Sequence, residues 1–475
     1  MKKSLGALCL LVVTLSVVAH DLGPKIDAIN KQALSLKNRC DSIKEFVDCL
    51  STNCCGGSGE ATDCACAPTL ITASTETIDN PGSYCLSENV ITTITVTTNA
   101  GVAIDLNGYT ASSLILGSNC KVKNGTVYSL SAGSNTFVSN IRVSGVTGNG
   151  AGSSVVLVDC SRLTSLQNVE RVVMARCTGD GASLFQIFAG VKEVTLYDSV
   201  FSFLRVKEEA SQFERLALYR SLIQSEVNFY NGDSLREFVS YQSVIGGQLY
   251  FQGVIFAELE RILIEESQIK RGAISINNLE PQKVDTLIQR SVFENGISVQ
   301  KFEGLVMRKC QLGGGLFLMT DNNVHVDNVS VTNDSTSAIS VAAGKNILLT
   351  DCCTTASTNG YAGYTTASGT ENLNLIRCYA KGCYDGFNLN SAASCLVKDC
   401  VCDGAQNVSF SGDSSATRAV GNIALSVGGV PATNYSPVTV PFDIDVNTII
   451  SASSMSDTEN TLERSAWRNM SFELP

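Results

Sequence analysis

A short phrase of apolar and polar residues recurs along most of the chain, as in VVLVDC, VTLYDS, LALYRS and ILLTDC. Each copy has apolar residues five and three positions before a small final residue, which we call the anchor. The anchors are Gly108, Gly125, Ile141, Cys160, Cys177, Ser199, Ser221, Ser243, Ser267, Ser291, Cys310, Val329, Cys352, Cys378 and Cys400. Their mean spacing, (400 − 108)/14 or about 21 residues, indicates one turn of a solenoid per copy.

Each copy predicts three short strands separated by bends. The alternation at Val194 and Leu196 predicts the first strand, and the anchor with the second residue after it predicts the next. A bend often rich in glycine follows, and then an apolar pair such as Leu249 and Phe251 predicts the third strand. We therefore expect an all-β chain that forms a right-handed parallel β-helix of about 15 coils.

Stacking explains why the anchors are small. In a β-helix, equivalent residues of neighbouring coils lie about 4.8 Å apart in the interior, where a larger side chain would crowd its copies. Five anchors in succession, from Ser199 to Ser291, are serines. We expect these hydroxyl groups to pass hydrogen bonds along the axis.

The segments NPGSYCLSENV, ITTITVTTNAGVAIDLNGYT and NCKVKNGTV, followed by the repeat, carry a family resemblance. Over residues 78–430 the sequence resembles the pectin-lyase-like right-handed parallel β-helix superfamily, and in particular secreted β-helix repeat proteins rather than a recognisable pectinase. The superfamily contains lyases, hydrolases, epimerases, tail spikes, adhesins and proteins of no known activity. The resemblance therefore implies the fold and leaves the function open.

The first 19 residues have the features of a cleaved signal peptide. Lys2 and Lys3 form a positive start, Leu5 to Val18 is almost wholly apolar, and small residues precede a cleavage site after Ala19. No later stretch is long and apolar enough to span a membrane. We expect a secreted or cell-surface protein.

A heptad pattern precedes the repeat. Apolar residues are spaced alternately three and four apart at Ile26, Ile29, Ala33, Leu36, Cys40, Ile43, Val47 and Leu50. This spacing is typical of a coiled-coil stem, which would make the protein a homo-oligomer through residues 26–50. A helix that caps the open end of the solenoid would need the same apolar stripe. We keep both alternatives for the segment 20–77.

Six cysteines follow closely in this segment: Cys40, Cys49, Cys54, Cys55, Cys64 and Cys66. In an exported chain such a cluster is typical of disulfide bonds. The paired C-x2-C spacing of a zinc site is absent, so we expect no metal. At the other end, residues 431–475 lose the repeat and are expected to form a C-terminal cap.

Charge limits the class of partner. The chain has 34 lysine and arginine against 45 aspartate and glutamate residues. Removing the signal peptide leaves 32 − 45, a net charge of −13. An acidic protein without a basic block repels phosphates, which excludes nucleic acid as an expected partner. Carbohydrate and a host-surface protein remain as the candidate partners.

An aromatic strip is the candidate binding site. Tyr197, Tyr219 and Tyr241 occur two positions before the anchors of three consecutive coils, beside Asp198 and Arg220. Aromatic rings next to acids and arginines resemble a sugar-binding face. Stacked tyrosines also stabilise β-helices without binding anything, and this alternative stays open.

The sequence contains no catalytic constellation that we can assign. Polygalacturonase-type hydrolases of the superfamily require a Gly-His-Gly segment together with an Arg-x-Lys, and the Gly-His-Gly segment is absent. The histidines are His20 and His325, and His325 fits an ordinary surface position. We predict a non-catalytic structural or glycan- or host-surface-binding protein that needs no cofactor. The alternative is a polysaccharide lyase or glycoside hydrolase.

Overall fold

The computed structural model describes residues 68–99, 101–181, 183–207, 213–229, 235–251, 259–275, 282–319, 321–333, 335–356, 360–412, 417–427, 433–435 and 470–474. All of them belong to one compact unit, Cys66–Pro475. The expected signal peptide, the heptad segment and the six clustered cysteines lie outside the described residues, as does most of the expected C-terminal cap.

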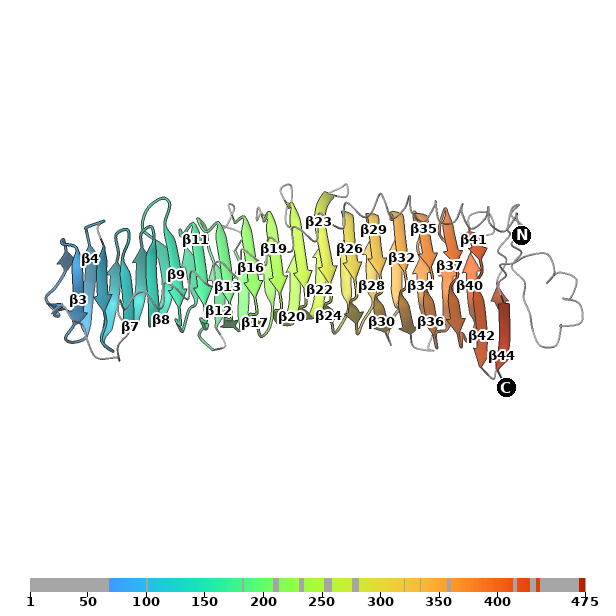
Figure 1. Ribbon diagram of the computed structural model, residues 1–475, viewed down its shortest axis with the longest axis horizontal. Helices are drawn as coiled ribbons and strands as arrows, with labels where there is room; N and C mark the ends of the chain where they lie inside the picture. Colours follow the sequence, from blue (N-terminus) through green and yellow to red (C-terminus); the bar gives the residue numbers. More distant parts are fainter. Residues whose placement is uncertain are drawn as a thin grey trace, which may run out of the picture. The chain divides into compact units, whose positions relative to one another are not determined.

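The described residues form parallel strands and no helix, and the strands stack in three columns along the long axis of Figure 1. Column A contains the strands that lead to each anchor. Its strands are β1 (Thr69–Ile71), β3 (Gly82–Leu86), β5 (Val102–Asp105), the first parts of β7 (Lys121–Ala132) and β8 (Thr136–Gly148), β9 (Ser154–Val158), β11 (Arg171–Ala175), β13 (Glu193–Tyr197), β16 (Arg215–Tyr219), β19 (Glu237–Tyr241), β21 (Arg261–Glu265), β23 (Gln282–Gln289), β26 (Phe302–Arg308), β29 (Asn322–Asp327), β32 (Lys345–Thr350), β35 (Glu371–Ile376), β38 (Cys395–Lys398) and β41 (Thr417–Val420).

Column B contains the short strands that follow the anchors. Its strands are β14 (Val200–Phe201), β17 (Leu222–Ile223), the first parts of β20 (Val244–Phe251) and β22 (Gln268–Ser275), β24 (Val292–Phe293), β27 (Gln311–Leu312), β30 (Ser330–Asn333), β33 (Cys353–Ala356), β36 (Tyr379–Lys381), β39 (Val401–Asp403), β42 (Ile423–Val427) and β44 (Met470–Leu474).

Column C completes each coil after the second bend. Its strands are β2 (Thr77–Ile78), β4 (Val90–Val96), β6 (Thr110–Ile115), the last parts of β7 and β8, β10 (Ser165–Gln167), β12 (Leu184–Ile187), β15 (Phe203–Val206), β18 (Val227–Phe229), the last parts of β20 and β22, β25 (Ile297–Gln300), β28 (Leu316–Met319), β31 (Ile339–Ala342), β34 (Ala362–Thr366), β37 (Asp385–Leu389), β40 (Val408–Gly412) and β43 (Thr433–Tyr435).

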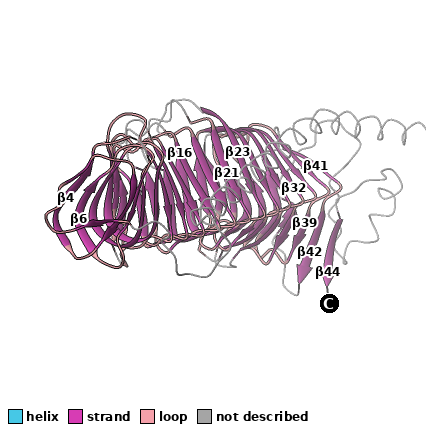
Figure 2. Cartoon of the chain, turned by 60° about the vertical axis from the view of Figure 1, so that its left-hand side comes forward, coloured by secondary structure: helices cyan, strands magenta, loops and turns pink. Residues whose placement is uncertain are grey.

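This arrangement confirms the parallel β-helix and its three-sided coil (Figure 2). Fourteen turns separate the fifteen predicted anchors, from Gly108 to Cys400. Column A also continues beyond them, with β1 and β3 before the first anchor and β41 after the last. The described strands therefore begin at Thr69, ahead of the boundary at residue 78 expected from the sequence.

The interior is a continuous apolar core made by the inward positions of all three columns. Val194 and Leu196 of β13 are fully buried, and so are Leu216 and Leu218, the residues in register with them in β16. Aromatic rings stack inside column C, where the ring centroids of Phe387 lie 4.6 Å from Tyr364 and 4.8 Å from Phe410. Each coil thus buries its apolar face against the next coil.

The anchors form an interior hydrogen-bonded ladder, as the serine run predicts. The backbone N–H of Ser199 donates to the Ser221 hydroxyl at 3.2 Å, and that of Ser221 donates to the Ser243 hydroxyl at 3.1 Å. The ladder also extends one coil beyond the predicted anchors, because Cys400 N–H donates to Asn422 Oδ1 at 2.8 Å. Asn422 is fully buried. At this position of the coil, Ser, Cys and Asn side chains therefore all accept the backbone N–H of the anchor in the preceding coil.

Among the described residues there is no helix long and apolar enough to cross a membrane.

Candidate functional site

The corner between columns A and B has an unusual backbone in every coil. The residue directly before each of the fifteen anchors has a positive φ, between 47° for Asp198 and 60° for Asn124. Asparagine tolerates this left-handed conformation better than other residues with a side chain, and Asn124 and Asn140 occupy it in early coils. In most later coils a charged residue takes the same place, with Gln242 and Asn328 as the exceptions.

These corner residues pair along the axis. Arg176 binds Asp159 with two parallel bonds of 2.8 and 2.9 Å, and Arg220 binds Asp198 with bonds of 2.7 and 2.8 Å. Such bidentate pairs at the surface contribute about 0–1 kcal/mol each. Asp198 and Arg220, two of the predicted site residues, are thus brought together as partners in a ladder.

The predicted tyrosines are only partly accessible. The rings of Tyr197 and Tyr219 stack 4.9 Å apart at an interplanar angle of 12°, but these residues are only 4% and 3% exposed. Tyr241, in the next coil, is half-buried. Tyr197 and Tyr219 therefore offer little ring surface to a sugar, which packs on an open aromatic face.

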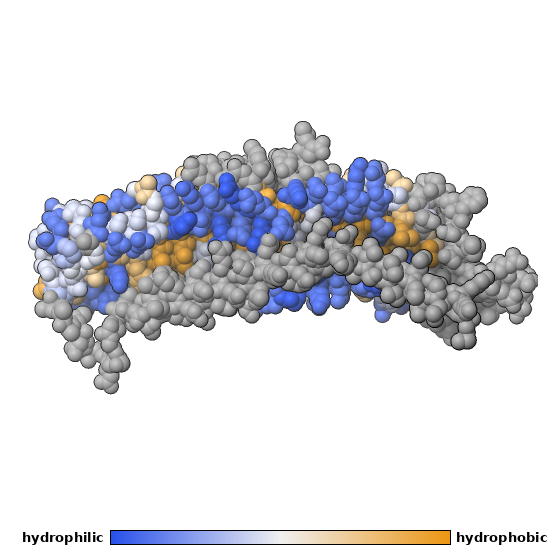
Figure 3. All heavy atoms as spheres, turned by 45° about the horizontal axis from the view of Figure 1, so that its top comes forward, coloured by the Kyte–Doolittle hydropathy of each residue, from blue (hydrophilic) through white to orange (hydrophobic). Residues whose placement is uncertain are grey.

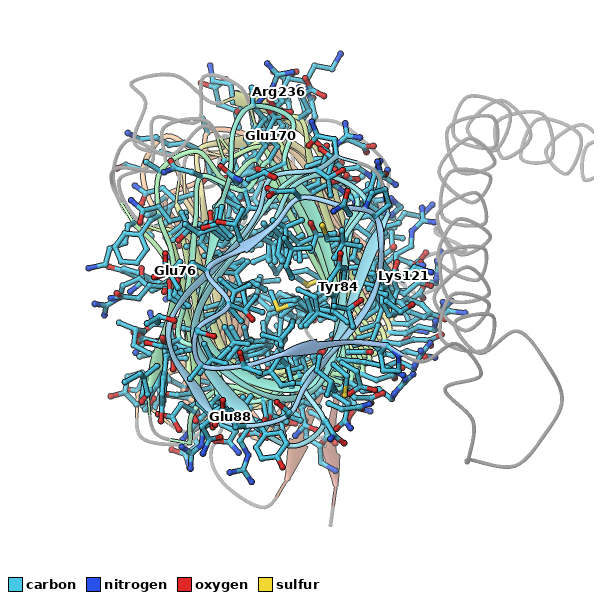
Figure 4. All side chains as sticks on the ribbon, turned by 90° about the vertical axis from the view of Figure 1, so that its left-hand side faces the viewer. Glu76, Tyr84, Glu88, Lys121, Glu170 and Arg236 are labelled. Atoms are coloured by element: carbon cyan, nitrogen blue, oxygen red, sulfur yellow. The ribbon has the colours of Figure 1, made fainter. Side chains whose placement is uncertain are left out.

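Charged residues also line the other edge of column A. The register places Arg171, Glu193, Arg215, Glu237 and Arg261 in successive coils, so opposite charges alternate. Arg215 and Glu237 form the closest pair, at 2.6 Å. Glu170 and Arg236 directly precede Arg171 and Glu237 in the sequence, and they lie at the same corner in the view along the shaft (Figure 4). Polar and hydrophobic side chains form separate bands along the shaft (Figure 3).

His325 lies on the outer face of β29 and is half-buried. Its Nε2 lies 3.4 Å from the Thr350 hydroxyl. Burial, assisted by the nearby Arg308, lowers the pKa of His325. The imidazole is therefore neutral near pH 7 and is a side chain of the shaft surface.

A polar network on the outer side of column C was not identified from the sequence. Asp385 is its centre: its two carboxylate oxygens accept hydrogen bonds from the amides of Asn388 at 3.0 Å and Asn407 at 2.9 Å. The Asn390 amide donates to Asn388 Oδ1 at 3.1 Å and to the Ser411 hydroxyl at 3.3 Å. We call these five residues the Asp385 network. They lie in or beside β37 and β40 and are half-buried or exposed, apart from Ser411, which is buried.

An exposed aromatic residue adjoins this network. Tyr384 directly precedes Asp385 and is 36% exposed. Its backbone N–H donates to the carbonyl of Tyr361, and its own carbonyl accepts the N–H of Asn407 at 2.8 Å. Tyr361, Tyr384 and Asn407 thus occupy one corner in three successive coils. The patch combines amide donors, carbonyl and carboxylate acceptors and an aromatic side chain.

The sequence contains a weak signal for this site. Asp385 and Asn407, two of its members, are 22 residues apart, which is about one coil length. Nothing in the repeat distinguishes them from other asparagines and aspartates until the register is known. Only the stacking of β37 on β40 brings them into contact.

Most of the described cysteines are part of the shaft interior rather than a metal centre. Thiols not bonded to another cysteine are carried by Cys120, Cys160, Cys177, Cys310, Cys352, Cys353, Cys378, Cys383, Cys395, Cys400 and Cys402. Burial raises the pKa of Cys310 to about 11, so its thiol is protonated at neutral pH. In the described part of the chain, no group of three or more His, Cys, Asp or Glu residues is placed to hold a metal ion.

Comparison with known proteins finds no matching family model, no matching curated protein and no matching solved structure. The fold is accordingly assigned from the strand pairing of this chain.

Proposed function

We propose that the protein is an exported, non-catalytic β-helix that binds a polyhydroxylated ligand, such as a glycan of a cell or host surface. The observation that carries this proposal is the Asp385 network beside the exposed Tyr384. Hydroxyl-rich ligands are recognised by planar amide and carboxylate groups, which donate and accept in fixed directions, together with an aromatic ring.

The distribution of charged groups supports a binding rather than a catalytic role. Polysaccharide cleavage requires acids, or an acid and a base, that converge on one bond of the substrate. Here Asp159 with Arg176, Asp198 with Arg220 and Asp351 with Arg377 pair along the shaft in separate places. The Arg377 side chain holds the pKa of Asp351 below its ordinary value, which favours a permanent carboxylate over a proton donor.

Export is the second part of the proposal. It rests on the sequence features of residues 1–19 and on the cysteine cluster between Cys40 and Cys66. The acidic character of the chain supports an extracellular ligand without phosphate groups. Sequencing the N-terminus of exported material should find His20 as the first residue, and retention of Met1 would contradict export through a cleaved signal.

The binding proposal is tested on a glycan array with the mature protein, and each bound glycan is then analysed for cleavage. We expect binding without cleavage. Cleaved products would favour the alternative, a lyase or a glycoside hydrolase. An array without any bound glycan would contradict the proposed ligand class.

Matched variants locate the site. Tyr384→Ala and Asn388→Ala should each weaken binding about five- to thirtyfold, because each removes a contact worth about 1–2 kcal/mol. Tyr128→Ala is the control, since Tyr128 is 62% exposed on a distant coil of the same column. Equal losses for Tyr384→Ala and Tyr128→Ala would place the binding site elsewhere.

A further inference from the structure

Asp321 is an acidic side chain inside the shaft. It lies at the corner that joins β28 to β29 and is 0% exposed. The register places Phe302 at the same position in the preceding coil and Gly344 in the next. Both are buried, so the carboxyl group is enclosed between coils rather than directed to solvent.

The carboxyl group is only half satisfied. Oδ1 accepts the backbone N–H of Phe302 at 2.8 Å, which ties the corner to the preceding coil. Oδ2 is buried and has no hydrogen-bond partner among the described residues. A buried carboxylate anion is stable only with several donors or a cation, whereas a neutral carboxyl tolerates one bond.

Asp321 forms no ion pair with a described cation. The charged residues beside this corner are Lys301 between β25 and β26, Glu303 of β26, Lys345 of β32 and Glu371 of β35. Lys345 pairs with Glu371 at 3.1 Å, and Glu303 accepts a bond from Asn323 at 2.9 Å. Burial raises the pKa of Asp321 to about 8, and the backbone N–H groups of Phe302, Met319 and Lys301 oppose that rise only in part.

We propose that the β28–β29 corner is a pH-sensitive latch, closed while Asp321 holds its proton and opened when the carboxyl group ionises. The ionised carboxylate must be hydrated to be stable. Water can reach it only if the corner moves out of the interior, and this movement breaks the hydrogen bond to Phe302. The next coil packs directly on the corner, because a Cβ at Gly344 would lie 2.7 Å from the Asp321 carbonyl oxygen. Opening therefore loosens β26, β29 and the start of β32 together.

The direction of the effect follows from the two pKa values. The pKa of Asp321 in the fold, about 8, exceeds its ordinary value of 3.8, so the unfolded chain loses this proton first. The contribution of Asp321 to stability is complete below about pH 4 and falls as the pH rises. Above about pH 8, Asp321 is ionised in both the folded and the unfolded protein, and the folded corner contains a buried charge. Asp321 then no longer contributes to stability.

Hydrogen exchange of the full chain at pH 6 and pH 9, corrected for intrinsic rates, tests the latch. We expect peptides of β26 and β29 to lose protection at least about tenfold more than those of β35 and β38, since pH 9 lies about one unit above the pKa. Asp321→Asn keeps an acceptor for Phe302 but does not ionise, so its protection at this corner should not change with pH.

Glu303→Gln is the matched control at the surface of the same corner and should behave as the wild type. Equal pH responses of wild type and Asp321→Asn would overturn the latch, and so would a loss spread evenly over all coils. If Asp321→Asn does not fold, carboxyl-carbon NMR of the aspartate-labelled wild type decides the matter. A titration near pH 8 is expected, and its absence would contradict the proposal.

Discussion

Serine and cysteine occupy the same interior position in two sections of the shaft. In the serine section, Ser199 to Ser291, each hydroxyl group donates to the carbonyl two residues earlier at 2.7–3.0 Å. In the cysteine section, Cys352 to Cys400, the thiols donate to carbonyl groups at 3.3–3.6 Å. The geometry of the coil is the same, and only the length and strength of the contacts differ.

This difference shows which properties of the anchor side chain the fold requires and which it only tolerates. The position requires a small side chain, because its copies stack at the coil spacing, and it favours a group that both donates and accepts. Sulfur meets these requirements with weaker hydrogen bonds, and a buried thiol behaves largely as a small apolar group. The serine section should therefore depend on hydrogen bonds, and the cysteine section on burial.

Enlarging an anchor should have the largest effect and should show the difference between sections. Ser221→Leu overpacks the corner and leaves the N–H of Ser199 without its acceptor, so we expect a loss of about 2–5 kcal/mol. Cys400→Leu should cost less, because the Cys378 N–H loses only a sulfur acceptor at 3.4 Å. Urea unfolding measures the loss of stability in both variants. A larger loss for Cys400→Leu would contradict the inference that the serine section depends more on hydrogen bonds than the cysteine section does.

Removing a hydroxyl group should have an intermediate effect. Ser243→Ala leaves the interior volume almost unchanged but deprives the Ser221 N–H of its acceptor at 3.1 Å. We expect a loss of about 1–3 kcal/mol in the free energy of unfolding. A value near zero would mean that the anchor stabilises the fold only through its small size and not through its hydroxyl group. The contrast between the serine and cysteine sections would then disappear.

Exchanging sulfur for oxygen should have the smallest effect on stability. Cys400→Ser gains a stronger hydrogen-bonding group and loses some apolar burial, so the two changes nearly cancel, to within about 1 kcal/mol. The urea midpoint measures the difference. A loss as large as that of Cys400→Leu would show that the position is specific for sulfur.

Thiol counting compares the shaft with the N-terminal cysteine cluster. On denatured, unreduced protein we expect the buried shaft thiols, such as Cys160, Cys310 and Cys400, to react. The six cysteines between Cys40 and Cys66 should remain paired and unreactive. Reaction of all 18 cysteines of the mature chain would contradict the disulfide prediction and favour a metal site there.

The repeat was predictable because its signal is periodic. Stacking requires the same residue class at every coil, so the anchors, the three strands and the serine ladder follow from spacing alone. The sites depend on single coils instead. The buried Asp321 and the contact between Asp385 and Asn407 have no periodic signal, and the alternation that places Tyr197 on the outer face does not predict its 4% exposure.

The left-handed corner could have been recognised from the sequence. Asn107, Asn124, Asn140 and Asn328 precede four anchors, and asparagine is the residue with a side chain that most readily adopts positive φ. Gln242 and the charged residues at the same corner conceal this signal in the other coils. Their axial pairing, as in Asp198 and Arg220, follows only from the register.

The most direct test of the account compares Ser243→Leu with Tyr241→Ser in one urea-unfolding experiment. Ser243 lies inside the shaft, at 1% exposure, and Tyr241 lies on the outer face, half-buried. We expect a loss of at least about 2 kcal/mol for Ser243→Leu and a clearly smaller loss for Tyr241→Ser. Equal losses for the two variants would contradict the assignment of faces on which the anchor ladder rests.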